Sequence, residues 1–129
     1  MDGLNEPAAP RKGIAAENWV DFLRDFAMRN NGRRARFDAF RADGTAQEET
    51  IEAHLEDAKL VSDGDARNVE IIRIERGDAN AEKIKDTITN VRQISVQYDT
   101  DGSEDALEIT DDQNTLVSLR LESKVDGNS

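Results

Sequence analysis

The sequence of 129 residues contains no cysteine and only two prolines, Pro7 and Pro10. The absence of cysteine excludes disulfides, zinc–thiolate sites, iron–sulfur clusters and thiol nucleophiles. No apolar run approaches the roughly 20 residues of a membrane-spanning helix, and the first residues lack the apolar core of a signal peptide, so we expect a cytoplasmic location. The prolines predict a flexible leader over residues 1–15, followed by one domain at 16–122 and a polar tail at 123–129.

Basic residues are also few relative to acidic ones. The sequence has 17 lysines and arginines but 28 aspartates and glutamates, which gives a net charge of −11. The resulting field repels polyanions, so we expect no direct binding of nucleic acid. The same charge would suit an inhibitor that mimics nucleic acid and binds a basic protein. It would equally suit an acidic surface that keeps the protein soluble, in ordinary or high salt. The composition does not distinguish between mimicry of nucleic acid, adaptation to high salt and ordinary solubility as the reason for the acidic surface.

An amphipathic α-helix is predicted over residues 18–30. Its apolar residues Trp19, Phe22, Leu23 and Phe26 lie at i, i+3, i+4 and i+7, which places them on one helical face. The Asn-Asn-Gly run that follows is a typical helix stop. Because this is the strongest amphipathic helix in the sequence, we predict that Trp19 and Phe26 lie in the hydrophobic core.

Alternation of apolar and polar residues predicts about six β-strands. Asp-Gly pairs at residues 43–44 and 63–64 predict hairpin turns. The composition of residues 47–59 also suits a helix, but the alternation around Leu55 favours a strand, with a β-bulge near residues 56–58. The strands are predicted at residues 33–41, 51–61, 69–75, 93–98, 107–109 and 117–121.

A second short helix is predicted over residues 80–90, because Ile84, Ile88 and Val91 lie at i, i+4 and i+7. The turns between strands are too short for parallel crossovers. The predicted fold class is therefore α+β. It consists of an N-terminal amphipathic helix packed on a mainly antiparallel, twisted or partly closed sheet of about six strands, with the second helix between the two strand triplets.

Two segments carry a resemblance to a known family. They are the first part of the predicted helix, Glu17-Asn18-Trp19 with Phe22, Leu23, Asp25 and Phe26, and the final hairpin Leu107-Glu108-Ile109. Together with the order of the predicted elements, these residues resemble an uncharacterised bacterial family, the domain of unknown function five-three-three-five. The likeness covers roughly residues 16–122, and the sequence departs from the family pattern at residues 54–57. The resemblance implies a small cytoplasmic α+β domain and implies no activity.

One acidic segment has the spacing of a calcium loop. If Gly102 takes the sixth position of such a loop, Asp99 and Asp101 occupy the third and fifth positions and Glu108 the twelfth. These three carboxylates are the candidate metal ligands. The first position is the neutral Gln97 and the flanking residues alternate like strands, so a charged hairpin tip explains the same residues.

A basic cluster is the candidate interaction patch, and a phosphate, an acidic peptide or nucleic acid are ligands that arginines of this kind bind. A hairpin register that pairs Phe37 with Ile51 would place one of the arginines beside His54 and another beside Glu52, so pairing of charges across strands also accounts for much of the cluster. The residues of the patch are Arg33, Arg34, Arg36 and Arg41.

No catalytic machinery is evident in the sequence. It has a single histidine, His54, and none of its serines lies in a nucleophile-elbow motif. We therefore expect no enzymatic activity and no cofactor. The expected function is a non-enzymatic, acidic protein-interaction domain that binds a protein partner or forms a homodimer through an exposed strand edge. The alternatives are the nucleic-acid-mimicking inhibitor and a weak calcium-binding domain that uses residues 97–108.

Overall fold

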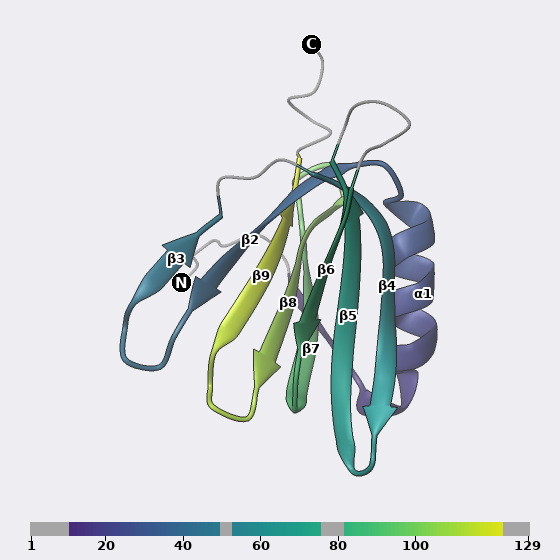
Figure 1. Cartoon of the computed structure of the whole chain (residues 1–129). Coiled ribbons are helices and arrows are strands. Elements are labelled where there is room, and N and C mark those ends of the chain that lie inside the picture. The colour runs from purple at the N-terminus through teal and green to yellow at the C-terminus, as the bar shows by residue number, and fades with distance from the viewer. Residues whose placement is uncertain (1–10, 50–52, 76–81, 123–129) are drawn as a thin grey trace, which may run out of the picture.

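The computed structural model describes residues 11–49, 53–75 and 82–122 (Figure 1). Within them, nine strands form one sheet in the order β1-β7-β8-β9-β2-β4-β5-β6, with β3 paired to β2, and every pair is antiparallel. No helix in this part of the chain is long and apolar enough to cross a membrane. The elements are β1 (Arg11–Ile14), a 3-10 turn (Ala16–Asn18), α1 (Trp19–Arg29), β2 (Arg34–Phe40), β3 (Ala46–Glu48), β4 (Ala53–Asp63), β5 (Ala66–Ile74), β6 (Lys83–Ile88), β7 (Val91–Tyr98), β8 (Glu104–Asp111) and β9 (Leu116–Leu121).

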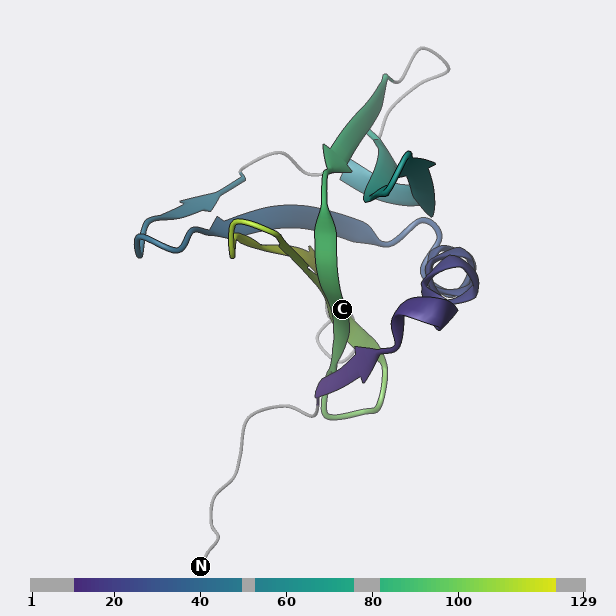
Figure 2. The ribbon, with the colours of Figure 1, turned by 90° about the horizontal axis from the view of Figure 1, so that it is seen from below.

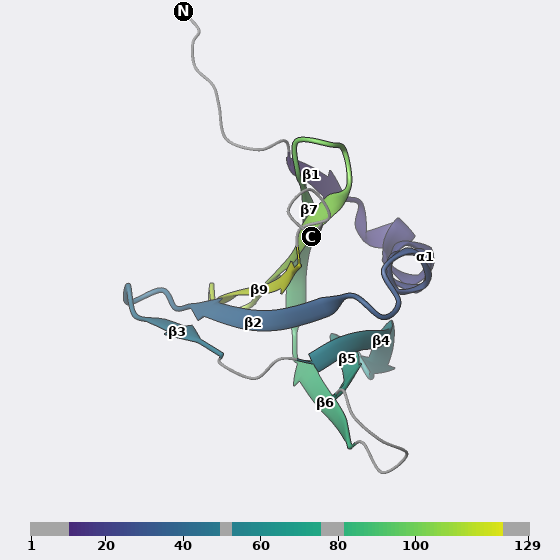
Figure 3. The ribbon, with the colours of Figure 1, turned by 90° about the horizontal axis from the view of Figure 1, so that it is seen from above.

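The sheet is strongly curled, with β2 and β3 lying at a steep angle to β7 (Figures 2 and 3). Strand β6 at one end of the sheet continues into β7, near the other end, through Thr89 and Asn90. Asn90 has a φ of 54°, a left-handed conformation that asparagine adopts more easily than most residues. This short link holds the two ends of the sheet together, so that its inner face encloses the core.

Helix α1 lies beside β4 (Figure 1) and contributes Trp19, Leu23, Phe26 and Ala27 to the hydrophobic core. Trp19 and Phe26 are 3% and 0% exposed, so the prediction that they are core residues is confirmed. The indole Nε1 of Trp19 donates a hydrogen bond of 2.9 Å to the carbonyl oxygen of Ile14. The buried indole nitrogen is therefore satisfied, and the helix is tied to the end of β1.

The predicted fold class is wrong. The described residues are mainly β, with one antiparallel sheet of nine strands and one short α-helix, rather than an α+β domain with two helices and about six strands. The predicted second helix is strand β6 over Lys83–Ile88, and residues 80 and 81 lie outside the described part. A spacing of four, as between Ile84 and Ile88, satisfies both helical and strand periodicity. Backbone pairing with β5 decides for the strand, in which Ile88 is buried and Ile84 half-buried.

Strand β1 lies within residues 1–15, which were predicted to be a flexible leader. All four of its residues pair with β7, from Arg11 opposite Gln97 to Ile14 opposite Ile94. Residues 11–14 therefore belong to the sheet, and residues 1–10 lie outside the described part. The predicted tail, residues 123–129, lies outside the described part.

The segment 47–59 is extended where the structure describes it. Strand β4 begins at Ala53, so the choice of strand over helix is confirmed, while residues 50–52 lie outside the described part. The register of β4 on β5 shifts between Leu55 and Asp57, so the predicted β-bulge is also confirmed.

The side chain of Arg73 on β5 is fully buried, with 0% exposure. Its Nη1 lies 3.0 Å from the carbonyl oxygen of Ala35 and 2.7 Å from Oε1 of Glu49, and its Nη2 lies 2.9 Å from Oε2 of Glu49 and 3.1 Å from Oδ2 of Asp86. The guanidinium carbon is 4.6 Å from the centre of the Phe37 ring. Charged hydrogen bonds thus connect β5 to β2, to the end of β3 and to β6.

The interactions of the Glu49 carboxylate lead us to expect that the folded protein loses stability at acid pH. Burial opposes its ionisation, but hydrogen bonds from Arg73 and from the Phe37 amide outweigh burial and hold the pKa of Glu49 below its ordinary value. The pKa of Glu49 is therefore lower in the folded protein than in the unfolded chain. The contribution of the ionised carboxylate to the unfolding free energy is complete above the unfolded pKa of about 4.3, and it is lost as the pH falls through the folded pKa. Between about pH 5 and pH 3, urea unfolding followed by Trp19 fluorescence should show a steeper loss of unfolding free energy in the wild type than in Glu49→Gln.

The exposed Glu75→Gln variant removes one carboxylate without touching Arg73, so it is the matched control for this experiment. It should keep the wild-type slope of stability against pH. Equal slopes in all three proteins would contradict a special contribution of Glu49.

Candidate functional site

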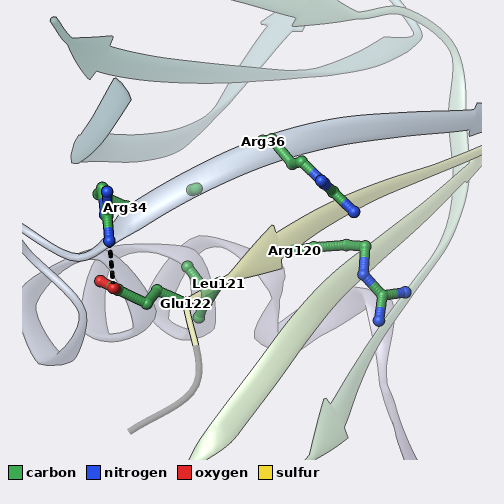
Figure 4. A pocket seen from close by; sticks show the side chains of 6 residues that line it. Arg34, Arg36, Arg120, Leu121 and Glu122 are labelled. Carbon is green, nitrogen blue, oxygen red and sulfur yellow. Dashed lines mark hydrogen bonds and ion pairs between the residues drawn. The ribbon is translucent and has the colours of Figure 1, made fainter. Parts of the chain in front are cut away.

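A hollow of about 230 Å³ lies on the outer face of strands β2 and β9 (Figure 4). Alternation along the strands produces it, because Ala35 and Leu121 point toward the core while Arg34, Arg36 and Arg120 lie on the opposite face. The hollow is lined by Arg34, Ala35, Arg36, Arg120, Leu121 and Glu122.

Arg36 and Arg120 are direct neighbours in the β2–β9 register. Like charges in this arrangement destabilise a sheet unless an anion lies near them. Asp38 is that anion: its carboxylate oxygens lie 3.9 Å from Nε of Arg36 and 3.8 Å from Nε of Arg120. These distances allow attraction between the charges but are too long for hydrogen bonds.

Asp38 is only 3% exposed, and its Oδ1 has no hydrogen-bond partner among the described residues. The side chains of Arg36 and Arg120 are 52% and 45% exposed. Two accessible guanidinium groups therefore share one buried carboxylate. The local charge is one unit positive, and the guanidinium N–H groups are suited to bind a carboxylate or phosphate.

The third arginine of the hollow, Arg34, forms an ion pair of 2.6 Å with Glu122 (Figure 4). The hydrogen bond from Arg34 lowers the pKa of Glu122. Arg34 lies opposite His54 in the β2–β4 register, as predicted, whereas the predicted neighbour of Arg36, Glu52, lies outside the described residues. Both residues of this ion pair line the hollow, and their opposite charges leave its net charge unchanged.

Arg33 and Arg41, the other two residues of the predicted patch, do not line the hollow. Arg33 donates hydrogen bonds to Oδ1 of Asn30 and to the carbonyl oxygen of Glu104, at 2.9 and 2.7 Å, and it also contacts the carbonyl oxygen of Glu122. Burial lowers the pKa of Arg33 although acidic groups lie nearby. Arg33 thus joins the end of α1 to β8, while Arg41 lies in the β2–β3 turn.

Arg120 was not among the predicted site residues. It is separated from Arg36 by more than 80 residues in the sequence, and only the pairing of β9 with β2 brings the two together. The available signal was local: Arg120 lies on the polar side of an alternating strand. That pattern indicates a solvent-facing side chain and says nothing about which strand lies beside it.

The structure does not bring together the three candidate metal ligands. Asp99 accepts a hydrogen bond from the Thr100 amide, and Asp101 accepts hydrogen bonds from the amide and hydroxyl of Ser103. Glu108 instead lies buried within β8. Among the described residues, no group of three or more histidine or acidic side chains is placed to hold a metal ion.

Glu108 has partners of its own on the sheet. Its carboxylate accepts two hydrogen bonds from Arg11, of 2.6 and 3.0 Å, and one of 3.1 Å from the hydroxyl of Ser95. These contacts connect β8 to β1 and β7, so the carboxylate that was a candidate twelfth ligand takes part in the packing of the sheet.

No family model matches this sequence, and no curated protein or solved structure was found to be similar to it. The resemblance to the domain of unknown function five-three-three-five therefore has no support from these comparisons.

Proposed function

We propose that this protein is a non-enzymatic interaction domain that binds an acidic segment of a protein partner at the hollow between β2 and β9. One observation carries the proposal: Arg36 and Arg120 lie side by side and share the buried carboxylate of Asp38. A carboxylate of the partner would neutralise the remaining positive charge and accept hydrogen bonds from the guanidinium N–H groups of Arg36 and Arg120.

The charge of the whole chain narrows the class of partner. With a net charge of −11, the protein repels long polyanions, so a nucleic acid would approach this small positive site against the field of the rest of the molecule. A short acidic stretch on a folded partner brings only a few charges, and the rest of its surface is free to carry positive charge. A positive site on a negatively charged protein therefore favours a protein partner whose surface has the opposite arrangement, an acidic segment surrounded by positive charge.

A fluorescent hexaglutamate peptide tests the site directly, with binding followed by fluorescence anisotropy. The double variant Arg36→Ala/Arg120→Ala should bind the peptide at least about tenfold more weakly, which corresponds to roughly 1.4 kcal/mol and is modest for charged hydrogen bonds. Binding to the wild type should also weaken with added salt, because the site is exposed and ions screen it beyond about 8 Å at physiological ionic strength.

The double variant Arg24→Ala/Arg92→Ala is the matched control, because it removes the same charge from exposed positions away from the hollow. It should bind the peptide like the wild type. The proposal fails if both double variants weaken binding equally, since the effect would then be one of net charge. It also fails if the wild type does not bind the peptide at low salt.

A further inference from the structure

A second cavity lies on the other side of β2, on the inner face of the curled sheet. Its volume is about 320 Å³, at the lower end of the range for small-molecule sites. Phe37, Ala39 and Val117 line it from β2 and β9 and are only partly buried, although they belong to the side of the sheet that faces the core. The cavity is lined by Phe37, Ala39, Gln47, Glu49, Asp86, Thr87, Ile88 and Val117.

The polar side of this cavity carries an excess of negative charge. Glu49 and Asp86 both bind the buried Arg73, so two carboxylates face one guanidinium. The carboxylate of Glu49 is fully engaged, because Oε1 accepts hydrogen bonds from Arg73 and from the Phe37 amide and Oε2 accepts a second one from Arg73.

Asp86 is engaged far less. From the described residues it accepts one hydrogen bond, of 3.1 Å at Oδ2, and its side chain is 40% exposed. One negative charge and one carboxylate oxygen are therefore left at the border of an apolar cavity. The chemistry that complements them is a positive charge with N–H donors, attached to a group that can cover Phe37, Ala39 and Val117.

We propose that this cavity binds a small molecule in which a protonated amine is attached to a compact apolar body. The amine donates to Asp86, and the apolar body rests on the inner face of β2 and β9. The ligand differs in charge and in location from the acidic segment at the arginine-lined hollow, because successive side chains of β2 point to opposite faces. The two sites are therefore independent, and either proposal stands or falls without the other.

Three probes of nearly equal size and different charge test the proposal: phenethylamine, 2-phenylethanol and phenylacetate. Titration of the full chain, followed by two-dimensional ¹H–¹⁵N NMR, should shift the amide resonances of Ala39, Thr87 and Val117. We expect phenethylamine to bind about tenfold more tightly than the alcohol, because an amine beside a half-buried carboxylate gains a charged hydrogen bond. The carboxylate probe should bind most weakly of the three.

Two variants assign the effect to this cavity. Asp86→Asn keeps the shape of the side chain and removes its charge, so the preference for the amine over the alcohol should disappear. Ala39→Trp fills the cavity and should block the amine and the alcohol alike. Asp112→Asn, which removes the charge of an exposed turn residue, should change nothing.

The proposal is overturned if none of the probes shifts the amides of the lining residues at millimolar concentration. It is also overturned if the alcohol binds as tightly as the amine, or if Asp86→Asn keeps the preference for the amine. The NMR spectrum shows at the same time whether each variant is folded. Should Ala39→Trp prevent folding, the comparison of probes on the wild type and on Asp86→Asn still decides the matter.

Discussion

Replacement of Arg73 by alanine should reduce the unfolding free energy by about 3–5 kcal/mol, the cost of removing one partner from a buried ion pair. The side chain is fully buried, and it donates hydrogen bonds to Ala35, Glu49 and Asp86. Without Arg73, the Phe37 amide is the one hydrogen-bond donor that Glu49 keeps within the described part of the chain. A protein of this size has a total stability of about 5–15 kcal/mol, so the loss is large enough to threaten folding at room temperature.

Urea unfolding at neutral pH, followed by Trp19 fluorescence, measures this change, because the single tryptophan is buried in the folded state. Arg73→Lys retains the charge but lacks the planar fork that reaches two carboxylates and a carbonyl, so it should lose less stability than the alanine variant and still lose some. The exposed Arg92→Ala is the control and should remain within about 0.5 kcal/mol of the wild type. A loss below about 1 kcal/mol for Arg73→Ala would contradict the importance of the buried cluster.

The second large effect is expected in helix α1, where Phe26→Ala should cost about 3–5 kcal/mol, as is typical when a buried phenylalanine is truncated. Phe26 is 0% exposed, and its ring centre lies 5.9 Å from that of Phe22. Its truncation removes apolar contacts and leaves a cavity between the helix and the sheet. Thermal unfolding should shift to lower temperature, and the urea midpoint should fall without a large change in slope.

Met28→Ala is the matched control for the helix, because Met28 lies on the same helix and is 71% exposed. Alanine favours a helix slightly more than methionine does, so this variant should be as stable as the wild type or slightly more so. If Phe26→Ala and Met28→Ala had equal effects, α1 would not be part of the core as the structure describes it.

Local patterns predicted several parts of the fold correctly. The spacing of Trp19 and Phe26 identified the buried face of α1, and the change of parity after Leu55 identified the bulge in β4. Even the pairing of Arg34 with His54 followed from counting through the predicted hairpin. These features depend on residues that are near each other in the sequence, where periodicity directly reports which side chains share a face.

The failed predictions concern elements whose local pattern is ambiguous or weak. Ile84 and Ile88 fit a helix and a strand equally well, and the hydrogen bonds of β6 to β5 decide between them. Strand β1 has almost no apolar alternation, and its backbone becomes extended because β7 offers a free edge. The short strand β3 (Ala46–Glu48) was not predicted either. The fold class was wrong because one strand was replaced by a helix and two others were omitted.

In the candidate sites, too, local features were predicted from the sequence and long-range contacts were not. The sequence predicted that Arg34 and Arg36 would be exposed on one strand face, but it contained no indication that Arg120 lies beside Arg36. Likewise, the cluster of Arg73 with Glu49 and Asp86 joins residues from three different strand regions. Neither group is recognisable by spacing, because none of its members lies at a motif-like distance from the others.

Four properties follow from the amino-acid sequence alone: the absence of thiol chemistry, the acidic charge, the apolar face of α1 and the in–out alternation of most strands. These properties depend on composition and on short-range backbone geometry. Three other properties are set by long-range contacts: the order of the strands, the curl of the sheet that brings β6 and β7 together, and the proximity of Arg36 to Arg120 and of Arg73 to its two carboxylates. The physical reason is that strand pairing is chosen by the burial of the whole apolar face and by backbone hydrogen bonds, which any two strands can form.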